Sequence, residues 1–161
     1  MNRLIVAALK SEVGHYFPDA NVLLTGVGKI NAAYALTKAL HMRKPGLVFN
    51  LGTAGSFKHS PGTVLICDRF YQRDMDVSPL GFAVGVTPYS TVPEVLEYGR
   101  VIEGYPPSLC GTGDNFNVCE QKHSSHCDAL DMEAYSLALV CKNENIPFVC
   151  VKYSLPSRIC G

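Results

Sequence analysis

The chain has 161 residues, of which 47% are apolar and 17% charged, and its formal net charge is zero. This length suits one domain with a substantial core, and the neutral balance without a basic run argues against a nucleic-acid partner. No apolar stretch reaches the ~20 residues that a membrane helix needs. The first apolar run ends at Lys10, too early for a secretory leader. We therefore expect a cytoplasmic protein without a membrane partner.

The first half of the chain shows short apolar runs typical of buried strands. They cover residues 4–9, 22–24, 47–51 and 63–67. Residues 29–42 instead carry apolar side chains near a 3.6-residue period and are rich in alanine, which predicts a helix.

The second half opens with residues 81–107, where Pro, Gly and Tyr are frequent and periodicity is weak, so we expect a long loop. A short strand is expected over residues 109–111, a helix over 132–142 capped by Asp131, and a last strand over 148–153. Strands that alternate with helices predict a single α/β domain over residues 1–161, with a mostly parallel or mixed central sheet flanked by helices.

The seven cysteines are odd in number and contain no Cys-x-x-Cys pair. Three of them lie in apolar runs: Cys67, Cys141 and Cys150. This pattern favours buried free thiols in a reducing compartment. A zinc site built from His123, His126 and Cys127 is disfavoured because a second ligand pair is missing. We therefore expect neither a metal nor a cofactor.

Four polar clusters follow predicted strands, where α/β sheets bind their ligands. They are Glu12, residues 52–56, residues 114–116, and Met132 with Glu133. Each has an ordinary alternative reading. Glu12 and Glu133 could be helix-start acids matched to the dipole, the Gly-Thr-Ala-Gly run a tight turn, and Phe116 a core residue.

Taken together and in order, these clusters resemble a known family. The matching segments are residues 7–13 (AALKSEV), 25–33 (TGVGKINAA), 50–55 (NLGTAG), 73–77 (RDMDV) with 81–82 (GF), 113–116 (GDNF), and 131–134 (DMEA) with 147–152 (PFVCVK). They resemble the 5'-methylthioadenosine/S-adenosylhomocysteine nucleosidases of the purine nucleoside phosphorylase superfamily, over roughly residues 3–153.

The resemblance implies a substrate and a role for each site residue. It implies hydrolysis of the N-glycosidic bond of a purine nucleoside, with release of adenine. Glu12 would activate the hydrolytic water, and Thr53 would place a hydroxyl near it. Phe116 would stack on the purine, Met132 would pack under the ribose, and Glu133 would accept hydrogen bonds from its hydroxyls. Carboxylates near the sugar suit the oxocarbenium-like transition state of glycoside cleavage.

The chain also departs from the family pattern. The segment after Val13 is short where the family has a hairpin. The family's last strand continues into Arg/Lys-x-Ile/Val-Ser-Asp, whose Asp supports protonation of the purine. Lys152 matches the start of that motif, but no Asp follows it, and the expected position falls among residues 154–156. The family's long final helix is missing as well, so we expect a domain that is incomplete at its C-terminus.

Two other functions stay open. A phosphorylase of this superfamily typically carries a Gly-Asp-Pro phosphate loop, whereas this chain has Lys10-Ser11-Glu12, which suits water activation better. An inactive purine-nucleoside-binding protein is the other alternative, because of the missing Asp. The resemblance further implies a homodimer, with residues 80–84 reaching a neighbouring subunit; the apolar side chains there are Leu80, Phe82 and Val84.

Overall fold

The computed structural model describes residues 2–17, 21–116 and 125–156. The elements in chain order are β1 (Arg3–Ala7), α1 (Lys10–Val13), β2 (Val22–Leu24), α2 (Lys29–Met42), β3 (Leu47–Ser56), β4 (Val64–Gln72), the short 3-10 helix η1 (Ser78–Leu80), β5 (Val95–Glu97), β6 (Pro107–Thr112), β7 (Ala129–Asp131), α3 (Ala134–Asn143) and β8 (Phe148–Pro156).

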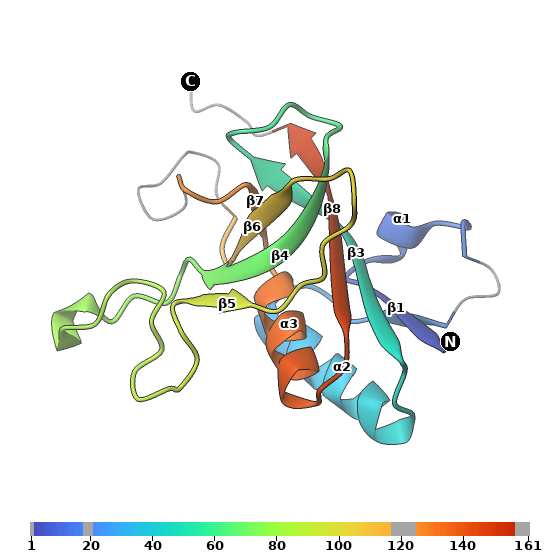
Figure 1. Ribbon diagram of the computed structural model, residues 1–161, viewed down its shortest axis with the longest axis horizontal. Helices are drawn as coiled ribbons and strands as arrows, with labels where there is room; N and C mark the ends of the chain where they lie inside the picture. Colours follow the sequence, from blue (N-terminus) through green and yellow to red (C-terminus); the bar gives the residue numbers. More distant parts are fainter. Residues whose placement is uncertain (1, 18–20, 117–124, 157–161) are drawn as a thin grey trace.

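The strands in the described part of the chain form one mixed sheet in the order β2-β1-β3-β7-β6-β4-β5. The last strand, β8, pairs in parallel with β3 and antiparallel with β4, and it runs between them in Figure 1. Strands β3, β7, β6, β4 and β8 therefore make a closed ring of hydrogen-bonded neighbours. The fold is a mixed α/β fold with a central mixed sheet and few helices.

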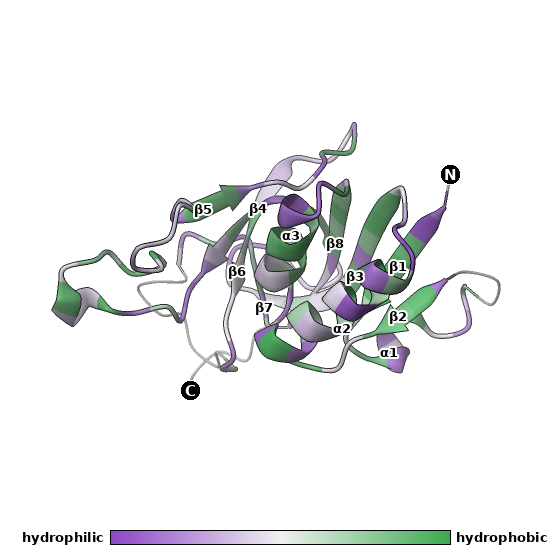
Figure 2. Cartoon of the chain, turned by 90° about the horizontal axis from the view of Figure 1, so that it is seen from below, coloured by the Kyte–Doolittle hydropathy of each residue, from purple (hydrophilic) through white to green (hydrophobic). Residues whose placement is uncertain are grey.

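Helices α2 and α3 contact each other and pack against the sheet (Figures 1 and 2). Their apolar residues share one core with the strands. Leu36 and Leu40 of α2 and Leu137 of α3 are almost fully buried there, with Val48 of β3 and Phe148 of β8. Burying such side chains stabilises a fold by about 1.5–3 kcal/mol each. The cysteines in the described residues are free and buried, as expected. They are Cys67, Cys110, Cys127, Cys141 and Cys150.

The structure corrects several sequence expectations. The Gly-Thr-Ala-Gly run is not a turn, because β3 continues through it and pairs with β8 from Gly52 to Ser56. The expected long loop contains β5, and β7 precedes α3. Helix α3 begins at Ala134, two residues later than expected, although the Asp131 carboxylate does accept a hydrogen bond from the Ala134 N–H at 2.8 Å.

Residues around η1 form an arm that extends away from the sheet in both views (Figures 1 and 2). Leu80 is 70% exposed at its tip, whereas Phe82 and Val84 are half-buried. The Phe82 ring packs edge-on against Tyr89, with ring centroids 5.7 Å apart. No helix in the part of the chain that the structure describes combines the length and the apolar character needed to cross a membrane.

Candidate active site

A pocket of about 310 Å³ lies where β1, β3, β7 and β8 end. Ligands of α/β sheets commonly bind beyond the carboxyl ends of the strands. All five residues that the sequence singles out line it: Glu12, Thr53, Phe116, Met132 and Glu133. Side chains from segments up to 121 positions apart in the sequence therefore share one cavity, which their spacing alone could not show.

Glu12 is held at the pocket wall by four hydrogen bonds. Helix α1 starts directly after β1, so the Glu12 carboxylate turns back, and its Oε2 accepts the N–H groups of Ala8 and Leu9, both at 3.0 Å. Its Oε1 accepts the Thr53 N–H at 2.9 Å and the Thr53 hydroxyl at 3.1 Å. A Cβ at Gly52 would lie 3.3 Å from this oxygen, so the glycine permits the close approach. The carboxylate is thereby fixed in one orientation.

Glu133 lies just before α3 and is 8% exposed. Its Oε1 accepts the Gly28 N–H at 2.9 Å, at the start of α2. Burial raises the pKa of Glu133, and the nearby Asp131 carboxylate raises it further, while the Gly28 hydrogen bond and Lys152 oppose the shift. The Gly28 backbone has φ +99, a conformation that favours glycine. Two helix starts thus meet at this carboxylate.

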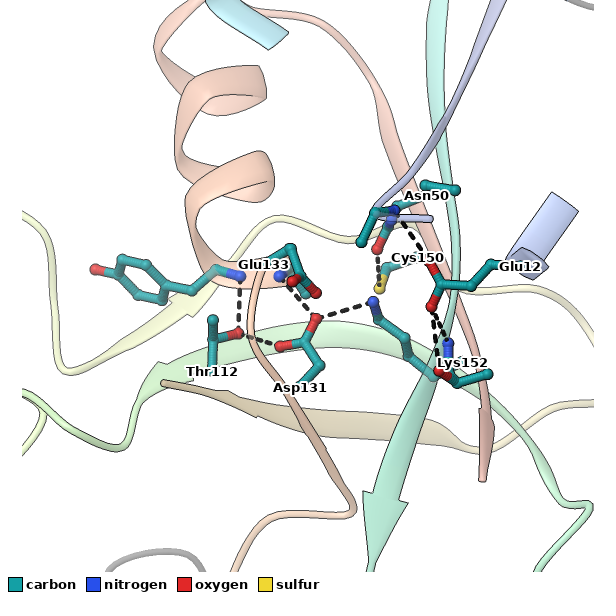
Figure 3. A network of polar contacts seen from close by, with 12 residues as sticks. Glu12, Asn50, Thr112, Asp131, Glu133, Cys150 and Lys152 are labelled. Atoms are coloured by element: carbon teal, nitrogen blue, oxygen red, sulfur yellow. Dashed lines mark hydrogen bonds and ion pairs between the residues drawn. The ribbon is translucent and has the colours of Figure 1, made fainter. Parts of the chain in front are cut away.

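A buried ion pair joins Lys152 to Asp131, which lines the pocket (Figure 3). Lys152 Nζ is 2.8 Å from Asp131 Oδ2, and both side chains are at most 2% exposed. Asp131 also accepts the Thr112 hydroxyl at 2.6 Å. Burial alone would raise the pKa of Asp131, but Lys152 and these hydrogen bonds lower it overall. Burial would lower the pKa of Lys152, but Asp131 raises it. The pair fixes the strand end that precedes Met132 and Glu133.

Another wall of the pocket is formed by Arg73, Asn115 and Phe116, and by Leu155 and Pro156 at the end of β8. The Phe116 ring is 81% exposed, so its side chain is not held by packing. Burial lowers the pKa of Arg73, although Asp74 and Asp131 oppose that shift. An arginine keeps its charge even so, because its ordinary pKa is above 12.

Comparison with known proteins places this chain in a family. The chain matches the phosphorylase superfamily over residues 8–155. It is 30% identical to the 5'-methylthioadenosine/S-adenosylhomocysteine nucleosidase of Staphylococcus aureus in an alignment that covers 94% of this chain and 75% of that relative. The chain belongs to this nucleosidase family. The Staphylococcus aureus relatives at this identity are nucleosidase enzymes.

Solved structures of nucleosidases share the fold. The Neisseria meningitidis enzyme, in complex with methylthio-immucillin-A, superposes with a TM-score of 0.83 at 22% identity, covering 99% of this chain and 87% of that one. The Streptococcus pyogenes S-adenosylhomocysteine nucleosidase, in complex with 5-methylthiotubericidin, gives a TM-score of 0.83 at 20% identity, with 99% and 85% covered.

Three residues around this pocket were not predicted as site residues: Arg73, Asp131 and Lys152. Lys152 did carry a usable signal, because it stands inside the apolar run of residues 148–153, and a lysine is almost never fully buried unless it is paired. Its partner could not be found from the sequence, since Asp131 reads equally well as a helix cap. Of the residues considered for zinc, His123 lies outside the described residues.

Proposed function

We propose that this chain hydrolyses the N-glycosidic bond of a purine nucleoside such as 5'-methylthioadenosine or S-adenosylhomocysteine, releasing adenine. The observation that carries the proposal is the presence of two held carboxylates, Glu12 and Glu133, on one pocket that also contains Phe116 and Met132. Cleavage of a glycosidic bond builds positive charge on the sugar, and nearby carboxylates stabilise that charge.

In this proposal Glu12 is the general base. The carboxylate takes a proton from water as the water attacks the anomeric carbon, while the bonding electrons of the C–N bond leave with the purine. The purine anion then takes up a proton from solvent to give adenine. The Thr53 hydroxyl donates a hydrogen bond to Glu12 Oε1 and keeps this oxygen oriented toward the pocket. Glu133 accepts hydrogen bonds from the ribose hydroxyls, Met132 packs under the ribose, and Phe116 stacks on the base.

Hydrolysis is favoured over phosphorolysis by the charges around the pocket. Phosphate needs cationic or N–H donors, yet the N–H groups beside Glu12 already donate to its carboxylate. Arg73 donates to backbone carbonyls, and Lys152 is paired with Asp131. A phosphate here would instead meet the negative charge of Glu12.

The end of β8, where the purine would be protonated, supports a second candidate function: a nucleoside-binding protein with little activity. By the resemblance, the position expected to carry a purine-protonating Asp falls among residues 154–156, where the chain has no Asp and the pocket is lined by Leu155 and Pro156. Neither side chain titrates. Departure of an unprotonated purine is unfavourable, and the loss of general acid assistance typically slows a reaction by about 10²–10⁴-fold.

Adenine release separates the candidates. Purified chain at high concentration is incubated with 5'-methylthioadenosine, with and without phosphate, and adenine is followed by chromatography. We expect slow adenine release that does not depend on phosphate. In Glu12→Gln the release rate should fall by about 10²-fold or more, the usual loss of a general base. Glu97→Gln, an exposed acid on β5, is the matched control.

Release that requires phosphate would establish a phosphorylase. Thermal stabilisation by the nucleoside without any adenine release would establish a binding protein. Equal rates for Glu12→Gln and the control would show that Glu12 is not the base.

A further inference from the structure

The segment that carries Phe116 is held from one side by Arg73. The guanidinium Nη2 donates to the carbonyls of Asn115 at 2.6 Å and Gly113 at 3.3 Å, and Nη1 donates to the Asn115 side-chain oxygen. The same side chain reaches the carbonyls of Gly111 at 3.3 Å and Asp131 at 3.4 Å. One planar group therefore joins residues 113–115 to the ends of β6 and β7.

The next residue, Asp74, holds the same segment through a different group. Its Oδ2 accepts the Asp114 N–H at 2.8 Å, and its Oδ1 pairs with Lys29 Nζ at 2.7 Å. The Asp114 carboxylate in turn accepts the Lys29 N–H at 2.8 Å. Burial alone would raise the pKa of Asp74, but the hydrogen bonds from Lys29 and Asp114 lower it overall. The segment is thereby tied to the start of α2, next to the N–H that Glu133 accepts.

Steric contact supports the same arrangement. A Cβ added at Gly113 would lie 2.9 Å from Arg73 Cζ and 3.1 Å from Asp74 Cγ, so the backbone passes closely against both side chains. By contrast, the Phe116 ring is 81% exposed and gains little from packing. Its place at the pocket depends on the backbone that precedes it, and Arg73 and Asp74 hold that backbone.

We propose that Arg73 and Asp74 are positioning residues that clamp residues 113–116, so that Phe116 stands ready to stack on the purine base. The stacking role rests on the proposed function, whereas the clamp itself does not. Arg73 supplies donors to carbonyls and Asp74 supplies an acceptor to an N–H, so together they satisfy both kinds of backbone group in this segment. Without them, the ring would have to be ordered at the moment of binding, which weakens binding.

The test uses a tryptophan reporter, because the chain contains no tryptophan of its own. Phe116→Trp is the parent, and Arg73→Met, Arg73→Lys and Asp74→Asn are each added to it. Arg69→Met is the matched control, since Arg69 lies on β4, the strand that ends just before Arg73, and its side chain contacts Asp68 at 3.4 Å. Anisotropy of the indole is measured without ligand, and adenine is then titrated while its quenching of the fluorescence is followed.

We expect Arg73→Met to lower the anisotropy and to weaken adenine binding about tenfold or more, because hydrogen bonds from a charged donor are lost. Arg73→Lys keeps the positive charge but lacks the planar guanidinium with its several N–H donors. It should therefore recover only part of the anisotropy and of the adenine affinity. Arg69→Met should match the parent. Anisotropy is the informative signal, since the ring is already exposed and its access to solvent can hardly increase.

The outcomes distinguish the clamp from the proposed function. If Arg73→Met and Asp74→Asn keep the anisotropy and adenine affinity of the control, the clamp is wrong. If anisotropy falls but adenine never quenches the parent, the clamp stands and the purine site is wrong. Circular dichroism verifies folding, and should Arg73→Met fail to fold, Arg73→Lys and Asp74→Asn decide the matter by the same two signals.

Discussion

Replacing Lys152 by methionine should destabilise the fold strongly. Methionine fills a similar volume but removes the ammonium that lies 2.8 Å from Asp131 Oδ2. The Asp131 carboxylate is then left buried with two hydrogen bonds, from the Thr112 hydroxyl and the Ala134 N–H. Breaking a buried ion pair on one side typically costs about 3–5 kcal/mol. For a chain of this size, that corresponds to a fall in melting temperature of about 6–20 °C.

Lys44→Met is the matched control for this measurement. Lys44 Nζ lies 3.1 Å from Glu144 Oε2, but its side chain is 62% exposed. Exposed pairs contribute about 0–1 kcal/mol, so this variant should melt close to the wild-type chain. Adding Asp131→Asn to Lys152→Met removes the stranded charge and should restore a large part of the lost stability. Chemical denaturation followed by circular dichroism gives the free energies of unfolding.

The pH dependence gives an independent check. The lowered pKa of Asp131 contributes stability that is present above the unfolded pKa of about 3.9 and is lost as pH falls through the folded value. The raised pKa of Lys152 contributes stability that is present below about 10.4 and is lost as pH rises through the folded value. In Lys152→Met, burial acts on Asp131 without its cation and raises its pKa, so the deficit should shrink on acidification. Equal melting of Lys152→Met and Lys44→Met at neutral pH would refute the reasoning.

The remaining predictions concern the pocket and the arm. If Glu133 accepts hydrogen bonds from the ribose hydroxyls, kcat/KM for the 2'-deoxynucleoside should fall well below that for the ribonucleoside, because the buried carboxylate loses a donor. Equal values would count against this role. Replacing Pro156 by Asp should speed adenine release, by up to about 10²–10⁴-fold, if protonation of the purine is what limits it, and an unchanged rate would put the limit elsewhere. The chain should sediment as a dimer at micromolar concentration and Leu80→Asp should shift it toward monomer, since Leu80 is 70% exposed on the arm; a monomeric wild-type chain would contradict the dimer.

Periodic and apolar patterns predicted much of the fold. Helix α2 was predicted with its observed bounds, Lys29–Met42, because its alanine-rich period extends over several turns. Strands β5 and β7 were missed, since three residues are too few to show a period. Strand β3 was cut short at its glycines, although they continue the strand by pairing with β8. The partner strand, which is remote in the sequence, decides that conformation.

For the site, the lining residues could be predicted from the sequence, whereas the contacts that support them could not. The five residues named from the sequence do line one pocket: Thr53 lies within β3, and the other four follow β1, β6 and β7. The supporting contacts could not be foreseen, since they join distant segments: Arg73 reaches Asn115, and Lys152 reaches Asp131. A sequence shows that a charge is present in an apolar run, but only the fold shows which group compensates it.

The position of β8 has a consequence for how the chain folds. Its residues pair with β3 about 100 positions earlier, as Phe148 does with Val48, and also with β4. Until β8 emerges from the ribosome, the edges of β3 and β4 that it occupies stay unpaired. Contacts between such distant residues slow folding, and unpaired strand edges favour aggregation. We therefore expect the sheet to close only after β8, Phe148–Pro156, has been released from the ribosome.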